Sequence, residues 1–357
     1  MLSWVVGVTP NFDLIIVLRP RAHCILQIPF LQPFGASRAV NPTIRSTVVV
    51  GAGAVGSFFG AMLARAGHRV TLIGRAPHVQ AIVRDGLQLH MGGQVQSVPM
   101  AATTELAAVR DADLVLFCVK STDTEAVARE IAPLLADDAL VLSLQNGVDN
   151  AASIARQVRQ TVVPAVVYVA TAMPQPGVVQ HFGRGDLVIG PLNARDAHDA
   201  ALQARLQSVA ELFATAQVPV RISPDVTGEL WSKLMVNCAY NAISALAQQP
   251  YGRMAALPAI REVQHAVVRE VVAVAQADGQ SLTLPAALEA MERIAVAMPA
   301  QFSSTAQDLA RGKPTEIDHL NGYVARRGAE LGIATPVNQT LHALVKLVEA
   351  GRAASAA

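Results

Sequence analysis

The sequence predicts an α/β fold with a doubly wound N-terminal domain and an all-helical C-terminal domain. Two observations predict it. Between Ser46 and Ile222, short apolar and β-branched runs alternate with helical patterns, which indicates a mostly parallel sheet covered on both faces. From Asp225 to Ala353, helical periodicity replaces the strand signals. We therefore expect an extension over residues 1–45, an α/β domain over 46–222 and a helical domain over 223–357.

Composition narrows the function classes. Of 357 residues, 52% are hydrophobic and 15% are charged, so the chain can bury a large core. The formal net charge of +1 argues against nucleic acid or an anionic membrane as partner. No apolar run approaches the roughly 20 residues that span a bilayer. The cysteines, Cys24, Cys118 and Cys238, are scattered without metal-ligand spacing, so we expect no metal site and a cytoplasmic location.

The first 45 residues differ from the rest. Their apolar stretch, residues 14–18, precedes Arg19 and Arg21, which is the wrong order for a secretory signal. We expect a loosely ordered extension there and assign it no function.

The α/β domain begins with one complete βαβ unit. Residues 47–50 form a β-branched run, residues 54–66 a helical pattern closed by Gly67, and residues 69–73 a second run. The later elements follow the same alternation. We expect strands at 114–119, 139–144, 162–170, 178–182 and 187–189, a helix at 124–135, and a hairpin formed by 87–90 and 95–100.

A glycine-rich turn joins the first strand and helix, which is the Rossmann-type arrangement for a dinucleotide. Gly51 allows the tight turn, Gly53 lets the backbone approach a pyrophosphate, and Gly56 lets the helix pack closely. The N–H groups at the helix start then face the phosphates. The predicted cofactor-binding turn is Gly51, Ala52, Gly53, Ala54, Val55 and Gly56.

Arg75 indicates which dinucleotide is bound. An NAD-binding unit usually carries Asp or Glu after the second strand, but here Ile73-Gly74-Arg75 occupies that place. A guanidinium can pair with a 2′-phosphate. The sequence therefore favours NADPH/NADP+ over NAD(H), with His78 a weaker candidate for the same pocket.

A polar stripe marks one helix of the C-terminal domain. Lys233, Asn237 and Asn241 are spaced i, i+4 and i+8 among apolar neighbours, so they share one helix face. Such a stripe suits a wet cleft, where a desolvated lysine can act as an acid near neutral pH. The alternative is a helix whose polar groups pair with nearby backbone.

Two further segments carry candidate residues. Glu316 either complements a helix dipole or reaches the cleft, where it would position Lys233 or a substrate hydroxyl. Asn146 and Lys120 each follow a predicted strand, where ligands of parallel sheets bind. Asn146-Gly147 is equally typical of an ordinary turn.

Together these residues resemble the ketopantoate reductase family. The likeness covers residues 46 to about 348. It is carried by GAGAVG at Gly51, by Arg75, by QNG at 145–147, by LWSKLMVNCAYN at 230–241 and by SSTAQDLARGKPTEID at 303–318.

The resemblance implies NADPH and a 2-keto acid bound between the two domains. It implies that Lys233 is the general acid, oriented with the substrate by Glu316, and that Ser304 binds the substrate carboxylate. Asn237 and Asn241 would bind substrate, Asn146 and Lys120 would lie at the junction of cofactor and substrate, and Arg75 would bind the 2′-phosphate. The implied reaction reduces 2-dehydropantoate (ketopantoate) to (R)-pantoate in pantothenate biosynthesis.

Departures from the family pattern leave the substrate open. Tyr251 stands where some members have a third asparagine, and Asp123 where many have glutamine. The alternatives are a reductase of another 2-keto acid, a β-hydroxyacid dehydrogenase or, with less support, an NADP(H) sensor without catalysis. A homodimer is possible, but no apolar surface in the sequence decides it.

Overall fold

The computed structural model describes residues 6–8, 14–16 and 43–356. Near the N-terminus, β1 (Val6–Val8) pairs antiparallel with β2 (Leu14–Ile16). Most of the expected extension over residues 1–45 lies outside the described residues.

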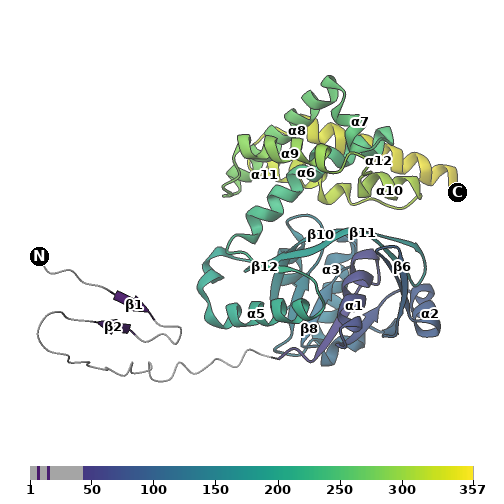
Figure 1. Cartoon of the computed structure of the whole chain (residues 1–357). Coiled ribbons are helices and arrows are strands. Elements are labelled where there is room, and N and C mark those ends of the chain that lie inside the picture. Colours follow the sequence, from purple (N-terminus) through teal and green to yellow (C-terminus); the bar gives the residue numbers. More distant parts are fainter. Residues whose placement is uncertain (1–5, 9–13, 17–42, 357) are drawn as a thin grey trace, which may run out of the picture. The chain divides into compact units, whose positions relative to one another are not determined.

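The α/β region contains one large sheet of ten described strands (Figure 1). Their order is β6-β5-β11-β10-β9-β8-β3-β4-β7, with β12 beside β11. The bounds are β3 (Ser46–Val50), β4 (Arg69–Ile73), β5 (Leu87–Met91), β6 (Gln94–Val98), β7 (Ala101–Thr103), β8 (Leu114–Phe117), β9 (Leu140–Ser143), β10 (Thr161–Gln175), β11 (Val178–Ile189) and β12 (Val220–Ile222).

Helices cover both faces of the parallel part of this sheet, as predicted. Alternate residues of β3 point to opposite faces. Val49 joins the core that includes residues of α1 and α5, whereas Val48 and Val50 join the core beside α3 and α4. The helices of this region are α1 (Ala54–Arg65), α2 (Ala76–Asp85), α3 (Thr124–Ile131), α4 (Asn150–Ala155) and α5 (Ala200–Thr215).

The sheet is mixed rather than parallel throughout. All pairings among β7, β4, β3, β8, β9 and β10 are parallel, but β10 pairs antiparallel with β11, and β5 with β6. The two strands expected at 178–182 and 187–189 are one strand, β11. Gly183, Arg184 and Gly185 have positive φ, and the register with β10 shifts at this point. Such a bulge disturbs the pairing locally without ending the strand.

The helix expected over 124–135 is also shorter than predicted. The α-helix α3 stops at Ile131, and a 3-10 turn follows over Ala132–Leu134. Pro133 explains the difference, because proline lacks the N–H that would continue the helix.

The C-terminal region is helical throughout its described length, as predicted. Its long helix α6 packs against α7, α8, α9, α10 and α12 and contributes Trp231, Met235 and Tyr240 to the core of this region. The helices are α6 (Val226–Ala247), α7 (Tyr251–Ala255), α8 (Pro258–Ala277), α9 (Leu284–Ala297), α10 (Ser304–Ala310), α11 (Asn321–Glu330) and α12 (Pro336–Ala356). Within the described part of the chain, no helix is long and apolar enough to cross a membrane.

The start of α6 packs directly on the sheet. Val226 and Leu230 share a small buried cluster with Val166 of β10 and Val188 of β11. Asp225 caps the helix by accepting a hydrogen bond from the Gly228 N–H at 2.9 Å. This contact places the next turn of α6, which carries Lys233, above β10.

Gly56→Ala tests the close packing of α1 on the glycine turn. A Cβ at Gly56 would lie 2.2 Å from the Gly51 carbonyl oxygen and 2.9 Å from a Val49 methyl group. We expect the free energy of unfolding to fall by about 1–3 kcal/mol, measured by chemical denaturation. Gly53→Ala is the matched control, because its Cβ would meet nothing within 4 Å. Equal losses in the two variants would contradict the packing argument.

Candidate active site

The glycine turn lies where β3 ends, and its shape depends on missing side chains. Gly51 has φ +110°, and a Cβ there would lie 2.7 Å from the backbone carbon of Cys118. Its N–H donates to the Ile73 carbonyl at 3.0 Å, which ties the turn to β4. A Cβ at Gly74 would lie 2.5 Å from that of Ala52. The turn therefore requires glycine both within it and at the end of β4.

The open side of the turn fits a pyrophosphate. Gly53 is the N-cap of α1 and offers no side chain to the helix N–H groups, and nothing lies within 4 Å of its Cβ position. A helix start without a capping side chain presents N–H donors and a positive dipole end. These features suit the dinucleotide turn expected over Gly51, Ala52, Gly53, Ala54, Val55 and Gly56, whose contact with a cofactor stays a prediction.

Arg75 is the second residue after β4, is exposed and is the N-cap of α2. His78, three residues on, is influenced by Arg75 and by a second cation. Burial of the imidazole, followed by the charges of Arg75 and Lys313, lowers the pKa of His78. The His78 Nδ1 atom is buried without a hydrogen-bond partner. Lys313, which the sequence analysis did not select, thus adds a positive charge from the helical region.

Lys233 points from α6 to the sheet. Its Nζ donates to Asn146 Oδ1 at 3.0 Å and to the Val167 carbonyl of β10 at 2.5 Å. Lys233 keeps some solvent exposure, but its ammonium is surrounded by protein atoms. That burial lowers its pKa to about 8, helped by the positive charge of Arg184 and opposed by Glu316. The lysine can therefore be protonated near neutral pH and still release its proton readily.

Glu316 reaches this lysine through Asn146. Its Oε2 accepts from Asn146 Nδ2 at 3.3 Å, while its Oε1 accepts from both the N–H and the hydroxyl of Ser121 at 3.1 Å. Asp318, two residues on, instead bonds to His342 and Lys346. The two acidic residues thus differ in surroundings: Glu316 faces the lysine cluster, and Asp318 bonds to side chains of α12.

The predicted substrate residues lie farther along α6. Asn241 is buried, and its Nδ2 is 3.5 Å from Ser304 Oγ at the start of α10. Ser303 caps α10, since its Oγ accepts from the Ala306 N–H at 3.0 Å. That leaves the exposed Ser304 as the serine free of a capping role. Asn237 is half-buried between Lys233 and Asn241 on the helix.

Lys120 joins the two regions. Its Nζ lies 2.8 Å from Asp308 Oδ2 of α10 and donates to the Pro314 carbonyl at 2.7 Å. The residue was predicted to lie at the junction of cofactor and substrate, and here it contacts the segment that carries Glu316. Its role toward a cofactor stays a prediction.

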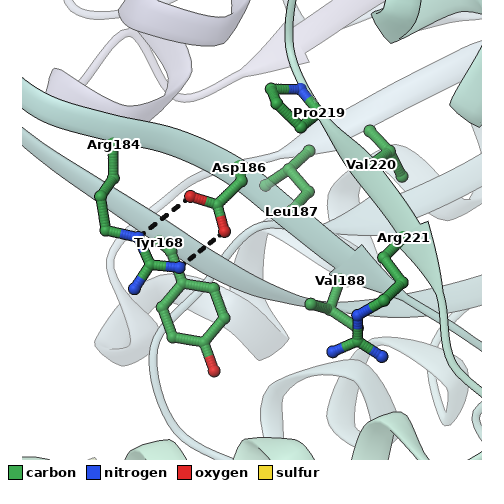
Figure 2. A pocket seen from close by; sticks show the side chains of 8 residues that line it. All are labelled: Tyr168, Arg184, Asp186, Leu187, Val188, Pro219, Val220 and Arg221. Atoms are coloured by element: carbon green, nitrogen blue, oxygen red, sulfur yellow. Dashed lines mark hydrogen bonds and ion pairs between the residues drawn. The ribbon is translucent and has the colours of Figure 1, made fainter.

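A pocket of about 470 Å³ lies beside this cluster, over β10, β11 and β12 (Figure 2). Arg184 stacks 4.1 Å above the Tyr168 ring and pairs with Asp186, as the dashed lines in Figure 2 show. Lys233 Nζ lies 5.8 Å from the same ring. Tyr168 therefore lies close to two cations, Lys233 and an Arg184 guanidinium that Asp186 holds in place.

Sequence reasoning missed several residues that support the cluster. Each follows the end of a parallel strand: Ser121 and Thr124 come after β8, and Asn150 after β9. The general rule that polar residues at carboxyl strand ends form ligand sites could have identified them. Tyr168 and Arg184 carried no such signal, because they lie within strands.

The fold and this cluster together define an oxidoreductase with a Rossmann-type domain. Residues 47–194 match the profile of the family described as ketopantoate reductase PanE/ApbA, and residues 225–349 match that of its C-terminal domain. The chain belongs to this family.

Individual relatives align with this chain over nearly their whole length. The 2-dehydropantoate 2-reductase of Halobacterium salinarum is 37% identical over 85% of this chain and 98% of its own. A PanE/ApbA family ketopantoate reductase structure from Ralstonia eutropha is 51% identical, with a TM-score of 0.79 over 86% of this chain and 99% of its own. The structure of a D-mandelate dehydrogenase with NADH and anilino(oxo)acetate has the same TM-score and coverage at 25% identity.

Lys233→Met tests the cost of the buried ammonium. Because the folded-state pKa of about 8 lies below the ordinary value of 10.5, the folded state pays for the charge at low pH. Between pH 8 and pH 10.5 the folded state has lost the lysine proton while the unfolded state still binds it, so the cost falls as pH rises. We expect the variant to exceed the wild type in free energy of unfolding by about 1–3 kcal/mol near pH 6.5, and by much less near pH 10. A difference independent of pH would contradict this.

Proposed function

We propose that the chain reduces 2-dehydropantoate (ketopantoate) to (R)-pantoate with NADPH, the reaction of pantothenate biosynthesis. One observation carries the proposal: a partly desolvated lysine, Lys233, lies between Asn146 and the backbone of β10 with Glu316 behind it. The substrate is supported by the curated relatives from Halobacterium salinarum and Vibrio cholerae, both named 2-dehydropantoate 2-reductase.

The dinucleotide would be held by the glycine turn and by Arg75. The uncapped start of α1 suits the pyrophosphate, and the positive charges of Arg75 and Lys313 around His78 suit a 2′-phosphate. When bound, NADPH supplies the hydride that the keto carbon accepts.

Lys233 would supply the proton. As the keto carbon is reduced, negative charge develops on the carbonyl oxygen, and the ammonium both stabilises this charge and donates a proton to it. Asn146 and the Val167 carbonyl hold the ammonium in one place, so little reorganisation is needed. Glu316 orients the Asn146 amide and adds a compensating negative charge.

The rest of the substrate would be bound from α6 and α10. Asn237 and Asn241 offer amides along the helix face that carries Lys233, and Ser304 is close to Asn241. A serine hydroxyl at the start of α10 suits a carboxylate. These assignments separate the keto group, near Lys233, from the acid group, near Ser304.

The direct test follows NADPH absorbance with purified protein and a panel of branched and unbranched 2-keto acids, arylglyoxylates included. Preferential turnover of ketopantoate is the expected result. Turnover of another keto acid alone would keep the mechanism and replace the substrate. Tight NADPH binding without turnover of any acid would contradict the proposal and favour a sensor.

Lys233→Ala tests the proton donor. Because general acid catalysis contributes about 10²- to 10⁴-fold, we expect kcat to fall by that range while the Kd for NADPH changes little. In the wild type, kcat/KM for the keto acid should fall above about pH 8, since reduction needs the protonated lysine. Loss of NADPH affinity would instead make Lys233 a cofactor ligand.

Arg75→Ala tests the choice of cofactor. We expect the KM for NADPH to rise at least tenfold more than that for NADH, because only NADPH carries the 2′-phosphate that a guanidinium binds. Steady-state kinetics with both cofactors measure this. Arg69→Ala, an exposed arginine of β4, is the matched control. Equal effects on both cofactors would remove Arg75 from this role.

A further inference from the structure

The buried amide side chain of Asn150 contacts two of the residues that surround Lys233. Asn150 is the first residue of α4 and is 3% exposed. Its Nδ2 donates to the Asn146 carbonyl at 2.5 Å and to Ser121 Oγ at 3.2 Å. Its Oδ1 accepts from Thr124 Oγ1 at 2.9 Å. One side chain therefore touches both the backbone of the residue that holds Lys233 and the hydroxyl that holds Glu316.

The amide is itself fixed by a chain of buried hydrogen bonds. Ser143 Oγ donates to Gln145 Oε1 at 3.1 Å, and Gln145 Nε2 donates to Thr124 Oγ1 at 2.7 Å. Since Thr124 accepts from Gln145, its own proton is free to go to Asn150. Each member is buried, so each bond sets the direction of the next and a single orientation of Asn150 results.

The same chain orients the far side of the site. The Ser121 hydroxyl, which accepts from the Asn150 amide, has two acceptors within reach: Glu316 Oε1 at 3.1 Å and the Asn146 carbonyl at 3.3 Å. The carboxylate is the stronger acceptor, and the Asn146 carbonyl already accepts from Asn150, so the geometry favours donation of the Ser121 proton to Glu316. The Asn146-Gly147 turn fits over the amide: a Cβ at Gly147, which has φ +96°, would lie 3.4 Å from Asn150 Nδ2. Asn146 then bonds Glu316 and Lys233 with its two side-chain atoms.

We propose that Asn150, oriented by Thr124, is a positioning residue for Lys233: it fixes the Asn146 carbonyl and the Ser121 hydroxyl, and through them the amide and the carboxylate that hold the lysine. This inference rests on the proposed function for its kinetic readout. It gives Asn150 no contact with substrate or cofactor.

A double-mutant cycle tests the proposal. Asn150→Ala should lower kcat about 10- to 100-fold with the KM for NADPH nearly unchanged, because a misplaced proton donor affects the reacting state most. If Asn150 acts through Asn146, the same change made in an Asn146→Ala background should cost less than about threefold. Full multiplication of the two losses would overturn the proposal.

Thr124→Val is the milder variant, since it keeps the side-chain volume and removes the hydroxyl that orients Asn150. It should lower kcat in the same direction by a smaller factor. Asn338→Ala is the matched control for a buried amide: Asn338 is fully buried and bonds to Asn321 and Glu270, away from the lysine. It should reduce stability without a selective loss of kcat. A kcat loss in this control equal to that of Asn150→Ala would also overturn the proposal.

A readout without turnover separates this inference from the proposed function. The rate of Lys233 acetylation by acetic anhydride, followed by peptide mass spectrometry across pH, reports the titration of the lysine. Asn150→Ala should move the midpoint by about half a unit or more, and the double variant no further than Asn146→Ala. An unmoved midpoint would overturn the positioning role. A wild type that reduces no keto acid would defeat the proposed function alone.

Discussion

The hydrogen bond between Lys233 and Asn146 joins a helix of the C-terminal region to the end of a strand in the sheet, and the rest of the site is arranged around it. A buried ammonium is costly without acceptors, and this one has two, an amide oxygen and a backbone carbonyl. Glu316 adds opposite charge from the far side of the Asn146 amide, and Arg184, which stacks on Tyr168, adds like charge. The balance leaves a lysine that keeps its proton at neutral pH but holds it weakly.

Much of the fold could be predicted from local patterns. The run of valines in β3, the glycines after it and the helical stripe of α6 are readable over a few residues, because periodicity and turn chemistry are local. The misses have local causes as well. Pro133 shortens α3, and the bulge at Arg184 lets β11 continue where a break was expected. The antiparallel placing of β11 beside β10 depends on long-range pairing that no short window records.

The candidate site divides in the same way. The stripe of Lys233, Asn237 and Asn241 follows from helix geometry, and Asn146 from its place after a strand. The contacts of these residues could not be predicted in this way. Glu316 and Lys233 come from separate segments, and these approach each other only because α6 packs on β10. Sequence reasoning offered two roles for Glu316, and the structure brings it to Asn146 and Ser121. The sequence carries no signal for the bond between Lys120 and Asp308, because that pair forms between the two regions.

One of the two acceptors that hold Lys233 is a main-chain carbonyl. β10 pairs with β9 only over Thr161–Pro164, and Val167 lies beyond that shared part. Any residue at position 167 would present the same oxygen, so substitutions there alter packing but leave this half of the lysine's anchorage in place. The other half depends on a single amide side chain. During evolution, residue 167 can therefore change without loss of its hydrogen bond to Lys233, whereas a change of Asn146 removes the other bond.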